Sequence, residues 1–246
     1  MGTQLYDGIG ESFEGFKTLP LARYGEVPAF LAMVGDVHGR SVLDLACGTG
    51  FYSRELRRRG ASRVLGVDVS PVMVDAARAA EEREPLGVAY EVGDVAELRA
   101  FGEPFDLAVA VQAFNYAPDV AALERMCRRI HRSLVPGGGF FVFGQSPEFR
   151  FDGPPLDKYG FRCERAGEDT EIGPRVRVTA LLEPPVSFPA NPPSRAVYES
   201  CLRGAGFRGL EWVPLEVSAE GLAAFGAEFW ADLVENPPLV MLRCRA

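Results

Sequence analysis

The sequence predicts an α/β fold built around a doubly wound, mostly parallel sheet. Ser41 to Phe51 runs from an apolar strand through Gly48-Thr49-Gly50 into a helix pattern. A strand, a glycine turn and a helix start in that order form a ligand-binding crevice. Farther along the chain, apolar segments of strand length alternate with helical ones, which is typical of parallel sheets with helices on both faces. We therefore expect a nucleotide-like ligand beside the glycine turn.

Apolar segments define the other strands of the predicted sheet. Phe105 to Val111 is an uninterrupted apolar run of the sort buried inside parallel sheets. Further strands are predicted at Arg63 to Val69, Val88 to Val92, Phe140 to Phe143, Gly209 to Val213 and Leu239 to Arg245. A single domain of 246 residues, of which 47% are hydrophobic, is large enough to bury such a core.

Helix start signals place three helices between these strands. Ser70 is a good N-cap, so Val72 to Ala80 is predicted to be helical, with Met73 facing the nucleotide. Asp119 starts a second helix, whose apolar residues recur at helical spacing as far as Leu134 and which Pro136 stops. A third helix runs from its cap at Ser194 to about Arg203.

The segments outside the alternating core have their own composition. Residues 1–36 precede the first strand and are rich in aromatic side chains, so we expect a cap over the sheet edge or its crevice, followed by a cofactor-binding core over 37–144. Residues 145–195 are rich in proline around one predicted strand, Arg175 to Leu181. This segment forms either a lid over the site or a hairpin extending the sheet edge. Residues 196–246 then complete the sheet.

Composition excludes several classes of function. The net charge of −8 argues against a nucleic-acid substrate, because phosphate binding requires clustered Lys and Arg. The one dense basic run, Arg57-Arg58-Arg59, is interpreted as the solvated end of a helix that stops at Gly60. Five cysteines without paired spacing suit a reducing compartment. Without a signal peptide or a long apolar run in the sequence, we expect a cytoplasmic protein with no membrane partner, either a monomer or a homodimer.

Asp68 is a candidate ribose ligand. It closes the strand after the glycine turn and lies 18 residues beyond Gly50, close to the offset of about 20 residues expected for a carboxylate that binds ribose hydroxyls. NAD and S-adenosylmethionine both carry this ribose. Asp68 alone therefore does not separate the two cofactors.

Three details favour S-adenosylmethionine over NAD. Asp44 lies four residues before Gly48, where a carboxylate would repel a pyrophosphate but would attract the ammonium group of a methionine. Ser53 stands where the dinucleotide fingerprint has its third glycine. Leu134 to Gly139 leads through a Pro-Gly-Gly turn into another apolar strand late in the sheet. An NAD-dependent oxidoreductase stays as the alternative that shares the glycine turn.

Four segments carry a resemblance to a known family. They are Val42 to Gly50, Gly66 to Pro71, Gly93 to Val95 and Pro136 to Gly138. In this order they resemble the motifs of class I S-adenosylmethionine-dependent methyltransferases, and the resemblance covers about residues 36–144. It implies a Rossmann-like, doubly wound, seven-stranded sheet with one antiparallel strand, an N-terminal cap and an insertion before the sixth strand. S-adenosyl-L-methionine is the implied methyl donor and S-adenosyl-L-homocysteine the product.

Shorter segments suggest a subgroup. Tyr6 to Gly10, Arg23 to Glu26 and Phe114 to Ala117 are similar to bacterial natural-product methyltransferases of the toxoflavin-pathway type. Relatives of that type include ring N-methyltransferases and indole C-methyltransferases. The resemblance implies a small heteroaromatic acceptor that is methylated at a ring carbon or a ring nitrogen. A phenolic O-methyltransferase and a non-catalytic S-adenosylmethionine-binding protein remain alternatives.

The resemblance and the predicted crevice together give candidate site residues. Those expected at the cofactor are Tyr6, Asp44, Ala46, Gly48, Thr49, Gly50, Asp68, Met73, Asp94, Val95 and Gln112. In the resembled enzymes the early tyrosine segment closes over the cofactor, which would place Tyr6 near the sulfonium. Asp94 would accept the adenine amino group beside a backbone donor from Val95, or else it only forms a turn. Phe114, Asn115 and Tyr116 are expected to face the acceptor.

Proton removal requires a base near the cap. Glu26 with Tyr24 is the candidate catalytic pair. The alternative is that Glu26 forms an ion pair with Arg23 at a helix start. The chain has only two histidines, and no carboxylate cluster follows the fourth strand, so we expect neither a histidine base nor a metal site.

Overall fold

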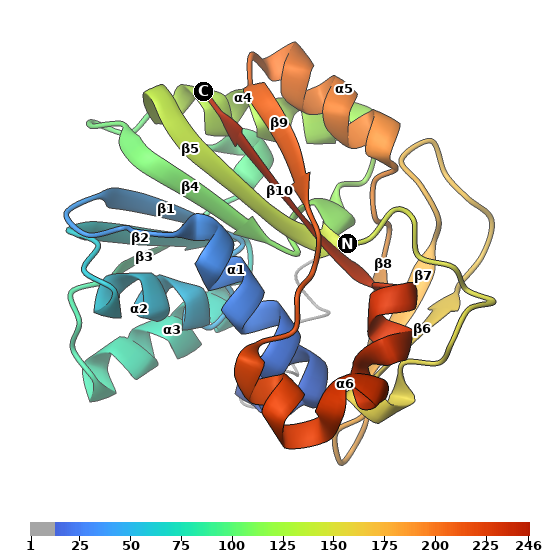
Figure 1. The fold of residues 1–246 in the computed structure, drawn as a ribbon. Coiled ribbons are helices and arrows are strands. Elements are labelled where there is room, and N and C mark those ends of the chain that lie inside the picture. Colours follow the sequence, from blue (N-terminus) through green and yellow to red (C-terminus); the bar gives the residue numbers. More distant parts are fainter. Residues whose placement is uncertain (1–12) are drawn as a thin grey trace.

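The computed structural model describes residues 13–246, and a seven-stranded sheet forms its centre (Figure 1). Its strands are β1 (Ser41–Leu45), β2 (Arg63–Asp68), β3 (Ala89–Val92), β4 (Phe105–Val111), β5 (Leu134–Gln145), β9 (Arg208–Val213) and β10 (Leu239–Arg245). They lie in the order β3-β2-β1-β4-β5-β10-β9. β10 runs antiparallel to both of its neighbours, whereas β1 to β5 pair in parallel. The predicted sheet with one antiparallel strand is confirmed.

Helices cover both faces of the sheet (Figure 1). They are α1 (Val27–Val34), α2 (Phe51–Arg58), α3 (Pro71–Arg83), α4 (Val120–Arg132), α5 (Arg195–Ala205) and α6 (Ala219–Glu235). Alternate strand residues point to opposite faces. Val42 and Val109 accordingly pack with α1, α2, α3 and α6, whereas Leu43 and Ala108 pack with α4 and α5. The doubly wound arrangement follows from this two-sided burial.

The predicted helix caps are present because they depend on local chemistry. The side chain of Ser70 accepts a hydrogen bond from the Met73 N–H, and the side chain of Asp119 accepts one from the Ala122 N–H at 2.6 Å. Ser194 caps α5 in the same way. Each cap satisfies an amide that the first turn of a helix leaves without a partner.

One predicted boundary is wrong. The helix that starts at Asp119 ends at Arg132 rather than at Pro136, and Leu134 begins β5. Leu134 pairs with Phe105 of β4, whose N–H donates to the Ser133 carbonyl at 2.8 Å. The register between β4 and β5 shifts just after this pair, so the missing N–H of Pro136 interrupts a ladder that is already irregular.

Residues 145–195 contain a separate antiparallel sheet. Its strands are β6 (Phe161–Arg165), β7 (Val176–Ala180) and β8 (Val186–Ala190), in the order β6-β7-β8. The predicted strand at Arg175 to Leu181 corresponds to β7. These strands form no ladder with the seven-stranded sheet, so the described segment does not extend the main sheet edge.

Two further segments complete the surroundings of the site. α6 bends at Gly226, whose φ is 78°, and it buries Trp230 and Leu233 against the main core. This helix was not predicted from the sequence. On the N-terminal side, a 3₁₀ turn over Phe13–Thr18 and a π-helical turn over Leu21–Glu26 lead into α1.

Candidate functional site

A cavity of about 750 Å³ lies at the carboxyl ends of β1, β2, β4 and β5. Ligand pockets usually measure roughly 300–1,000 Å³, so this cavity can hold a nucleoside-sized molecule together with a second small one. Its floor comes from residues that follow the parallel strands, among them Ala46, Val69 and Gln112. Phe161, Cys163, Val178 and Phe188 reach it from the three-stranded sheet. Open α/β sheets bind their ligands in this position.

The glycine turn lies at one end of the cavity. Gly48 lines it, with a φ of 54°. Gly50 has a φ of 81° and packs against Tyr90, since an added Cβ would lie 2.7 Å from the ring carbon Cζ of Tyr90. Thr49 is buried, and neither it nor Gly50 lines the cavity. These two residues, which were predicted to contact the cofactor, therefore shape the turn and do not face the cavity.

Asp44 lies in the cavity wall. It is 1% exposed and accepts a hydrogen bond from the Ser53 hydroxyl at 2.5 Å. Burial raises the pKa of the Asp44 carboxyl to about 7, although the hydrogen bond from Ser53 lowers it. A buried carboxyl of this kind is stabilised in its charged form by a cation. The residue that replaces the third fingerprint glycine thus holds the Asp44 carboxylate.

Asp68 holds the glycine turn from the neighbouring strand. Its carboxylate accepts the Gly48 N–H and the Ser70 N–H, each at 2.9 Å. Burial raises the pKa of Asp68, and these backbone hydrogen bonds oppose the rise. A carboxylate has about four acceptor positions, so Asp68 keeps acceptor capacity toward the cavity that it lines.

The predicted adenine side of the cavity is built from three residues. Met73, Asp94 and Val95 all line the cavity. Asp94 accepts the Ala96 N–H at 2.7 Å and so starts a 3₁₀ turn over Val95–Glu97. Asp94 therefore forms a turn with one oxygen, and its second oxygen stays open to a ligand.

Ala46 and Gln112 end neighbouring strands in the same unusual conformation. Their φ values are 56° and 58°, a left-handed region that residues other than glycine seldom adopt. The Gln112 N–H donates to the Phe143 carbonyl at 2.6 Å. The side chain of Asn115 donates to the Gln112 amide oxygen. This hydrogen bond fixes Gln112 at the cavity wall.

The predicted acceptor residues separate in space. Tyr116 lines the cavity. Phe114 is 1% exposed and packs between Phe140 and Tyr198, at centroid distances of 6.1 and 5.8 Å, and Asn115 is also buried. Neither Phe114 nor Asn115 lines the cavity. They follow β4 closely, but the 3₁₀ turn over Phe114–Tyr116 points them into the core beneath α5.

Glu26 lies in the cavity with partners other than the expected ones. It accepts hydrogen bonds from the Lys17 ammonium and, at 2.8 Å, from the Tyr52 hydroxyl. All three residues line the cavity. Burial raises the pKa of Tyr52 well above its usual value, and the Glu26 carboxylate raises it further. Tyr52 therefore stays protonated and donates to Glu26.

The expected partners of Glu26 lie elsewhere. Tyr24 packs edge-on against Phe225 and Trp230, at centroid distances of 5.6 and 6.3 Å, and it does not line the cavity. Arg23 pairs with Glu220 at 3.3 Å instead of with Glu26. The turn over Leu21–Glu26 is π-helical. The residue spacing of an α-helix therefore does not predict the directions of its side chains. Tyr6 lies outside the described residues.

Lys17 and Tyr52 are site residues that the sequence analysis missed. Lys17 is one of only two lysines in the chain, and Tyr52 lies two residues after the glycine turn. Both signals were available in the sequence. The two residues are 35 positions apart in the sequence, and only the folded chain brings the Lys17 ammonium to 3.3 Å from the Tyr52 hydroxyl oxygen.

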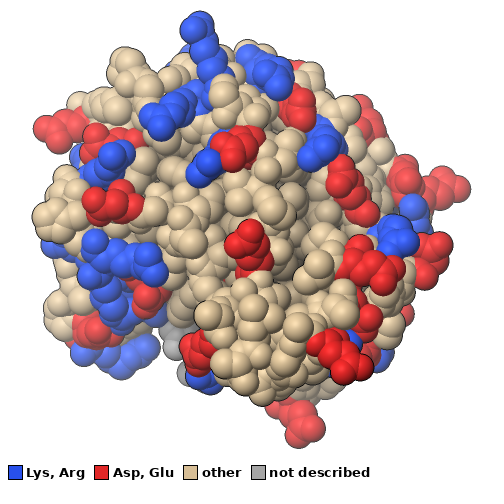
Figure 2. Space-filling view, viewed as in Figure 1, with Lys and Arg blue, Asp and Glu red and all other residues tan. Residues whose placement is uncertain are grey.

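Three structural findings concern other kinds of site. Among the described residues, His, Cys, Asp and Glu form no group of three or more that could hold a metal ion. Within the same part of the chain, every helix is too short or too polar to cross a membrane. Acidic and basic side chains lie interspersed over the face drawn in Figure 2.

Comparisons with known proteins agree with this geometry. Residues 42–138 match a family described as a methyltransferase domain. Magnesium-protoporphyrin O-methyltransferase of Rhodobacter capsulatus is 40% identical over 104 residues, which are 41% of this chain and 45% of that protein. Ubiquinone biosynthesis O-methyltransferase of Coxiella burnetii is 32% identical over 103 residues, 42% of each protein. The chain thus aligns with less than half the length of these curated relatives.

Solved structures extend the likeness to the whole fold. The crystal structure of an S-adenosylmethionine-dependent methyltransferase from Mesorhizobium loti has a TM-score of 0.66 at 24% sequence identity, and it covers 94% of this chain and 100% of that one. At this identity the likeness concerns the fold. The matched segment supplies β1 to β4 and most of the cavity floor. Residues 42–138 therefore resemble a methyltransferase domain, and the chain shares its fold with a solved S-adenosylmethionine-dependent methyltransferase.

Proposed function

We propose that this protein transfers the methyl group of S-adenosylmethionine to a small, flat, heteroaromatic acceptor. The observation that carries the proposal is the buried Asp44 carboxylate at the end of β1, one strand away from Asp68 in the same cavity. A cationic amino-acid group suits Asp44, whereas a pyrophosphate would face a buried negative charge there.

The cavity offers a partner for each part of this cofactor. Asp44 would hold the ammonium group, and Asp68 would accept the ribose hydroxyls with its remaining lone pairs. Asp94 and Val95 would receive the adenine, with Met73 packed against the nucleoside. These residues line one continuous cavity, which supports a single extended ligand.

The chemistry leaves the protein two tasks. S-adenosylmethionine held by Asp44, Asp68 and Asp94 would supply an activated methyl group and would leave as a neutral thioether. The protein must hold the acceptor at near-attack distance, an effect that can supply roughly 7–11 kcal/mol in well-oriented systems. It must also remove a proton where the acceptor atom carries one.

Glu26 is the proposed base. The Tyr52 hydroxyl and the Lys17 ammonium both donate to its carboxylate, and these hydrogen bonds orient it within the cavity. Tyr52 takes the supporting place that the sequence analysis gave to Tyr24. An acceptor N–H, or the C–H of a methylated ring carbon, would give its proton to Glu26.

O-methylation of a phenol-like acceptor is the second candidate. The ammonium of Lys17 beside Glu26 favours it, because a nearby cation stabilises a developing phenolate while the carboxylate accepts the proton. The two curated relatives described above are named as O-methyltransferases. A ring-carbon acceptor gains no such stabilisation from Lys17.

Two measurements test the proposed function. S-adenosylhomocysteine should raise the melting temperature of the protein, and NAD should not. Incubation with methyl-labelled S-adenosylmethionine and a panel of indoles, pteridines and phenols should then label one acceptor class. Stabilisation by NAD alone would reject the proposal. Cofactor binding without turnover on any member of a wide panel would favour a non-catalytic binding protein.

A further inference from the structure

Gln145 ends β5 between two cavities. It lines both the 750 Å³ cavity and a neighbouring one of about 170 Å³. The residue is 8% exposed, and its amide makes no hydrogen bond with any other residue that the structure describes. Its amide is not among the fully enclosed unpaired polar groups of the described residues, so it is reached from the cavities that it lines. An amide held in this way between two cavities is placed to bind a ligand.

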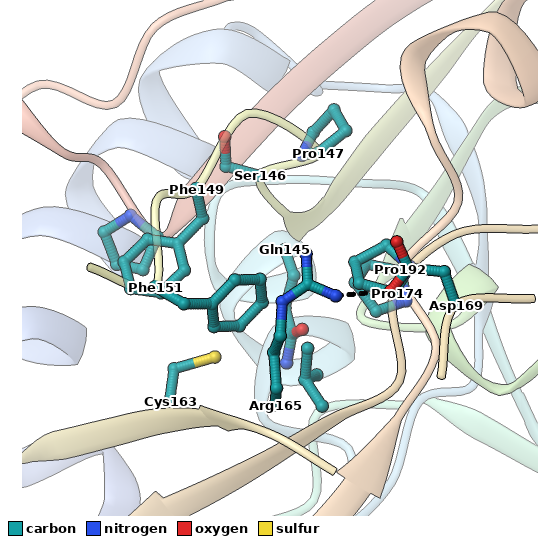
Figure 3. A pocket seen from close by; sticks show the side chains of 12 residues that line it. Gln145, Ser146, Pro147, Phe149, Phe151, Cys163, Arg165, Asp169, Pro174 and Pro192 are labelled. Atoms are coloured by element: carbon teal, nitrogen blue, oxygen red, sulfur yellow. Dashed lines mark hydrogen bonds and ion pairs between the residues drawn. The ribbon is translucent and has the colours of Figure 1, made fainter. Parts of the chain in front are cut away.

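The smaller cavity lies beneath the three-stranded sheet. Figure 3 shows Gln145 in the middle of its lining, with Phe149 and Phe151 on one side and Pro174 and Pro192 on the other. An ion pair of 2.5 Å between Arg165 and Asp169 also lines the cavity. The Arg165 guanidinium lies 4.9 Å from the centroid of the Phe151 ring.

The two cavities are neighbours that share part of their walls. Gln145, Cys163 and Pro238 line both of them. The two cavities therefore meet at these three side chains. Cys163 and Pro238 offer apolar surface at this junction, so the Gln145 amide is the polar group among the three.

We propose that Gln145 recognises the acceptor of the proposed methyl transfer by its lactam edge, a carbonyl next to an N–H. The inference rests on the proposed function and adds the acceptor's chemical class to it. An amide side chain presents one acceptor and one donor group side by side, so a lactam edge satisfies both through two parallel hydrogen bonds. Gln and Asn read adenine edges in DNA by the same bidentate pairing.

The smaller cavity sets the size of a substituent on this acceptor. A cavity of about 150 Å³ has room for benzene, and the cavity beside Gln145, lined by the Arg165–Asp169 ion pair as well as by aromatic rings and prolines, measures about 170 Å³. The acceptor accordingly carries its reacting ring in the larger cavity and a ring-sized substituent in the smaller one. The lactam N–H pairs with Gln145, so another atom of the acceptor takes the methyl group.

The test uses 2-quinolinone as the probe and N-methyl-2-quinolinone as its matched control. Their dissociation constants are measured by calorimetry for the wild-type protein and for Gln145→Met, with and without saturating S-adenosylhomocysteine. In the wild type the N–H compound should bind about tenfold more tightly, which corresponds to one buried hydrogen bond. In Gln145→Met the two compounds should bind equally. Gln145→Glu keeps the side-chain shape but lacks the N–H donors, so it should also weaken binding of the lactam.

Several outcomes would overturn the inference. They are undetectable binding of 2-quinolinone to the wild type, equal binding of the two compounds to the wild type, and the same preference in Gln145→Met. S-adenosylhomocysteine should bind the wild type and both variants equally, which also verifies that the variants are folded. If the wild type does not bind S-adenosylhomocysteine, the proposed function fails, whereas the lactam preference is still read from the titrations without it.

A second pair of measurements tests the smaller cavity. Among the 3-, 4- and 6-phenyl derivatives of 2-quinolinone, at least one should bind the wild type more tightly than the parent compound. Val176 is 1% exposed and lines only the smaller cavity, so Val176→Phe should remove this gain and leave the parent's affinity unchanged. If no derivative gains affinity, or if the gain survives in Val176→Phe, the smaller cavity is not the substituent site.

Discussion

The Ser53 hydroxyl donates a 2.5 Å hydrogen bond to the Asp44 carboxylate, and both side chains are completely or almost completely buried. The bond joins the first turn of α2 to the end of β1 across the glycine turn. It lowers the pKa of Asp44, but burial outweighs it, and the carboxyl titrates at about 7. In the free protein, the Asp44 carboxyl therefore changes between its neutral and its charged form close to neutral pH.

Cofactor binding should weaken in acid. An ammonium group binds the ionised form of Asp44, so below pH 7 binding must first release the proton. The affinity for S-adenosylhomocysteine should fall toward tenfold per pH unit below about pH 7 and level off above it. Calorimetry from pH 5.5 to 8.5, in buffers with different ionisation heats, measures both the affinity and the released proton. Asp44→Asn should bind weakly at every pH, and a wild-type affinity independent of pH would contradict the assignment.

The same carboxyl should limit the stability of the free protein. Its folded pKa of about 7 lies above the usual 3.8, so its stabilising contribution is complete below about pH 4 and disappears as the pH rises through 7. Asp44→Asn should therefore be more stable than the wild type at pH 8, by on the order of 1–4 kcal/mol. Urea unfolding at pH 4 and pH 8 measures this difference, which should nearly vanish at pH 4.

Asp106 provides a control of opposite sign. Hydrogen bonds from the Ser41 N–H and hydroxyl, both 2.8 Å, lower its pKa. A lowered pKa contributes stability above the unfolded value that is lost as the pH falls. Asp106→Asn should thus lower the stability at pH 8, where Asp44→Asn raises it. If both variants change the free energy of unfolding at pH 8 in the same direction, burial does not control the pKa of Asp44.

Asp68→Asn should lose most cofactor affinity. The wild-type carboxylate accepts two backbone N–H groups, and an amide would turn a donor toward one of them. Losing these charge-assisted bonds and the ribose contact should weaken S-adenosylhomocysteine binding by about 10- to 100-fold. Asp94→Asn, at the edge of the same cavity, should cost less than tenfold. If the two variants lose similar amounts of affinity for S-adenosylhomocysteine, Asp68 does not bind the cofactor more strongly than Asp94 does.

Glu26→Gln should separate turnover from binding. If Glu26 removes the acceptor's proton, the variant should lower kcat by about 10²-fold or more and leave the affinity for S-adenosylhomocysteine unchanged. Tyr52→Phe removes only the 2.8 Å hydrogen bond to Glu26 and should lower kcat by less than tenfold. Steady-state kinetics with the acceptor found in the labelling panel gives both values. A Glu26→Gln enzyme with near-normal kcat would end its candidacy as base.

Gly50→Ala should destabilise the glycine turn. Gly50 has a φ of 81°, and a methyl group there would lie 2.7 Å from Cζ of Tyr90. Backbone strain together with this overlap should lower the free energy of unfolding by about 2–4 kcal/mol. In Gly50→Ala/Tyr90→Leu the overlap is removed and the strain remains, so part of the loss should be recovered. Additive losses in the double variant would reject the contact with Tyr90 as a cause.

Local chemistry explains what the sequence predicted well. The glycine turn, the caps at Ser70 and Ser194, and the apolar run of β4 each depend on residues close in sequence, and the structure contains all of them. The doubly wound form of the main sheet followed from the alternation of strands and helices, although its strand order was not predicted. Asp44 and Asp68 could be assigned to the site because the ends of parallel strands meet at one edge.

Long-range contacts explain what the sequence did not predict. Leu134 fits a helix by spacing, but pairing with Phe105 makes it a strand residue. Phe114 follows β4 as an acceptor residue should, yet the core beneath α5 buries it. Lys17 finds Tyr52 only through the folded chain. No local pattern separates these outcomes, because each depends on a partner from a distant segment.

The separate pairing of the three-stranded sheet has an evolutionary consequence. β6, β7 and β8 share no ladder with the strands that carry Asp44 and Asp68, yet their side chains form one wall of the cavity. Mutations in that wall can therefore retune which molecule is accepted while the machinery beneath it is inherited intact. A lineage with this layout can change the acceptor it takes by substitutions confined to one small sheet.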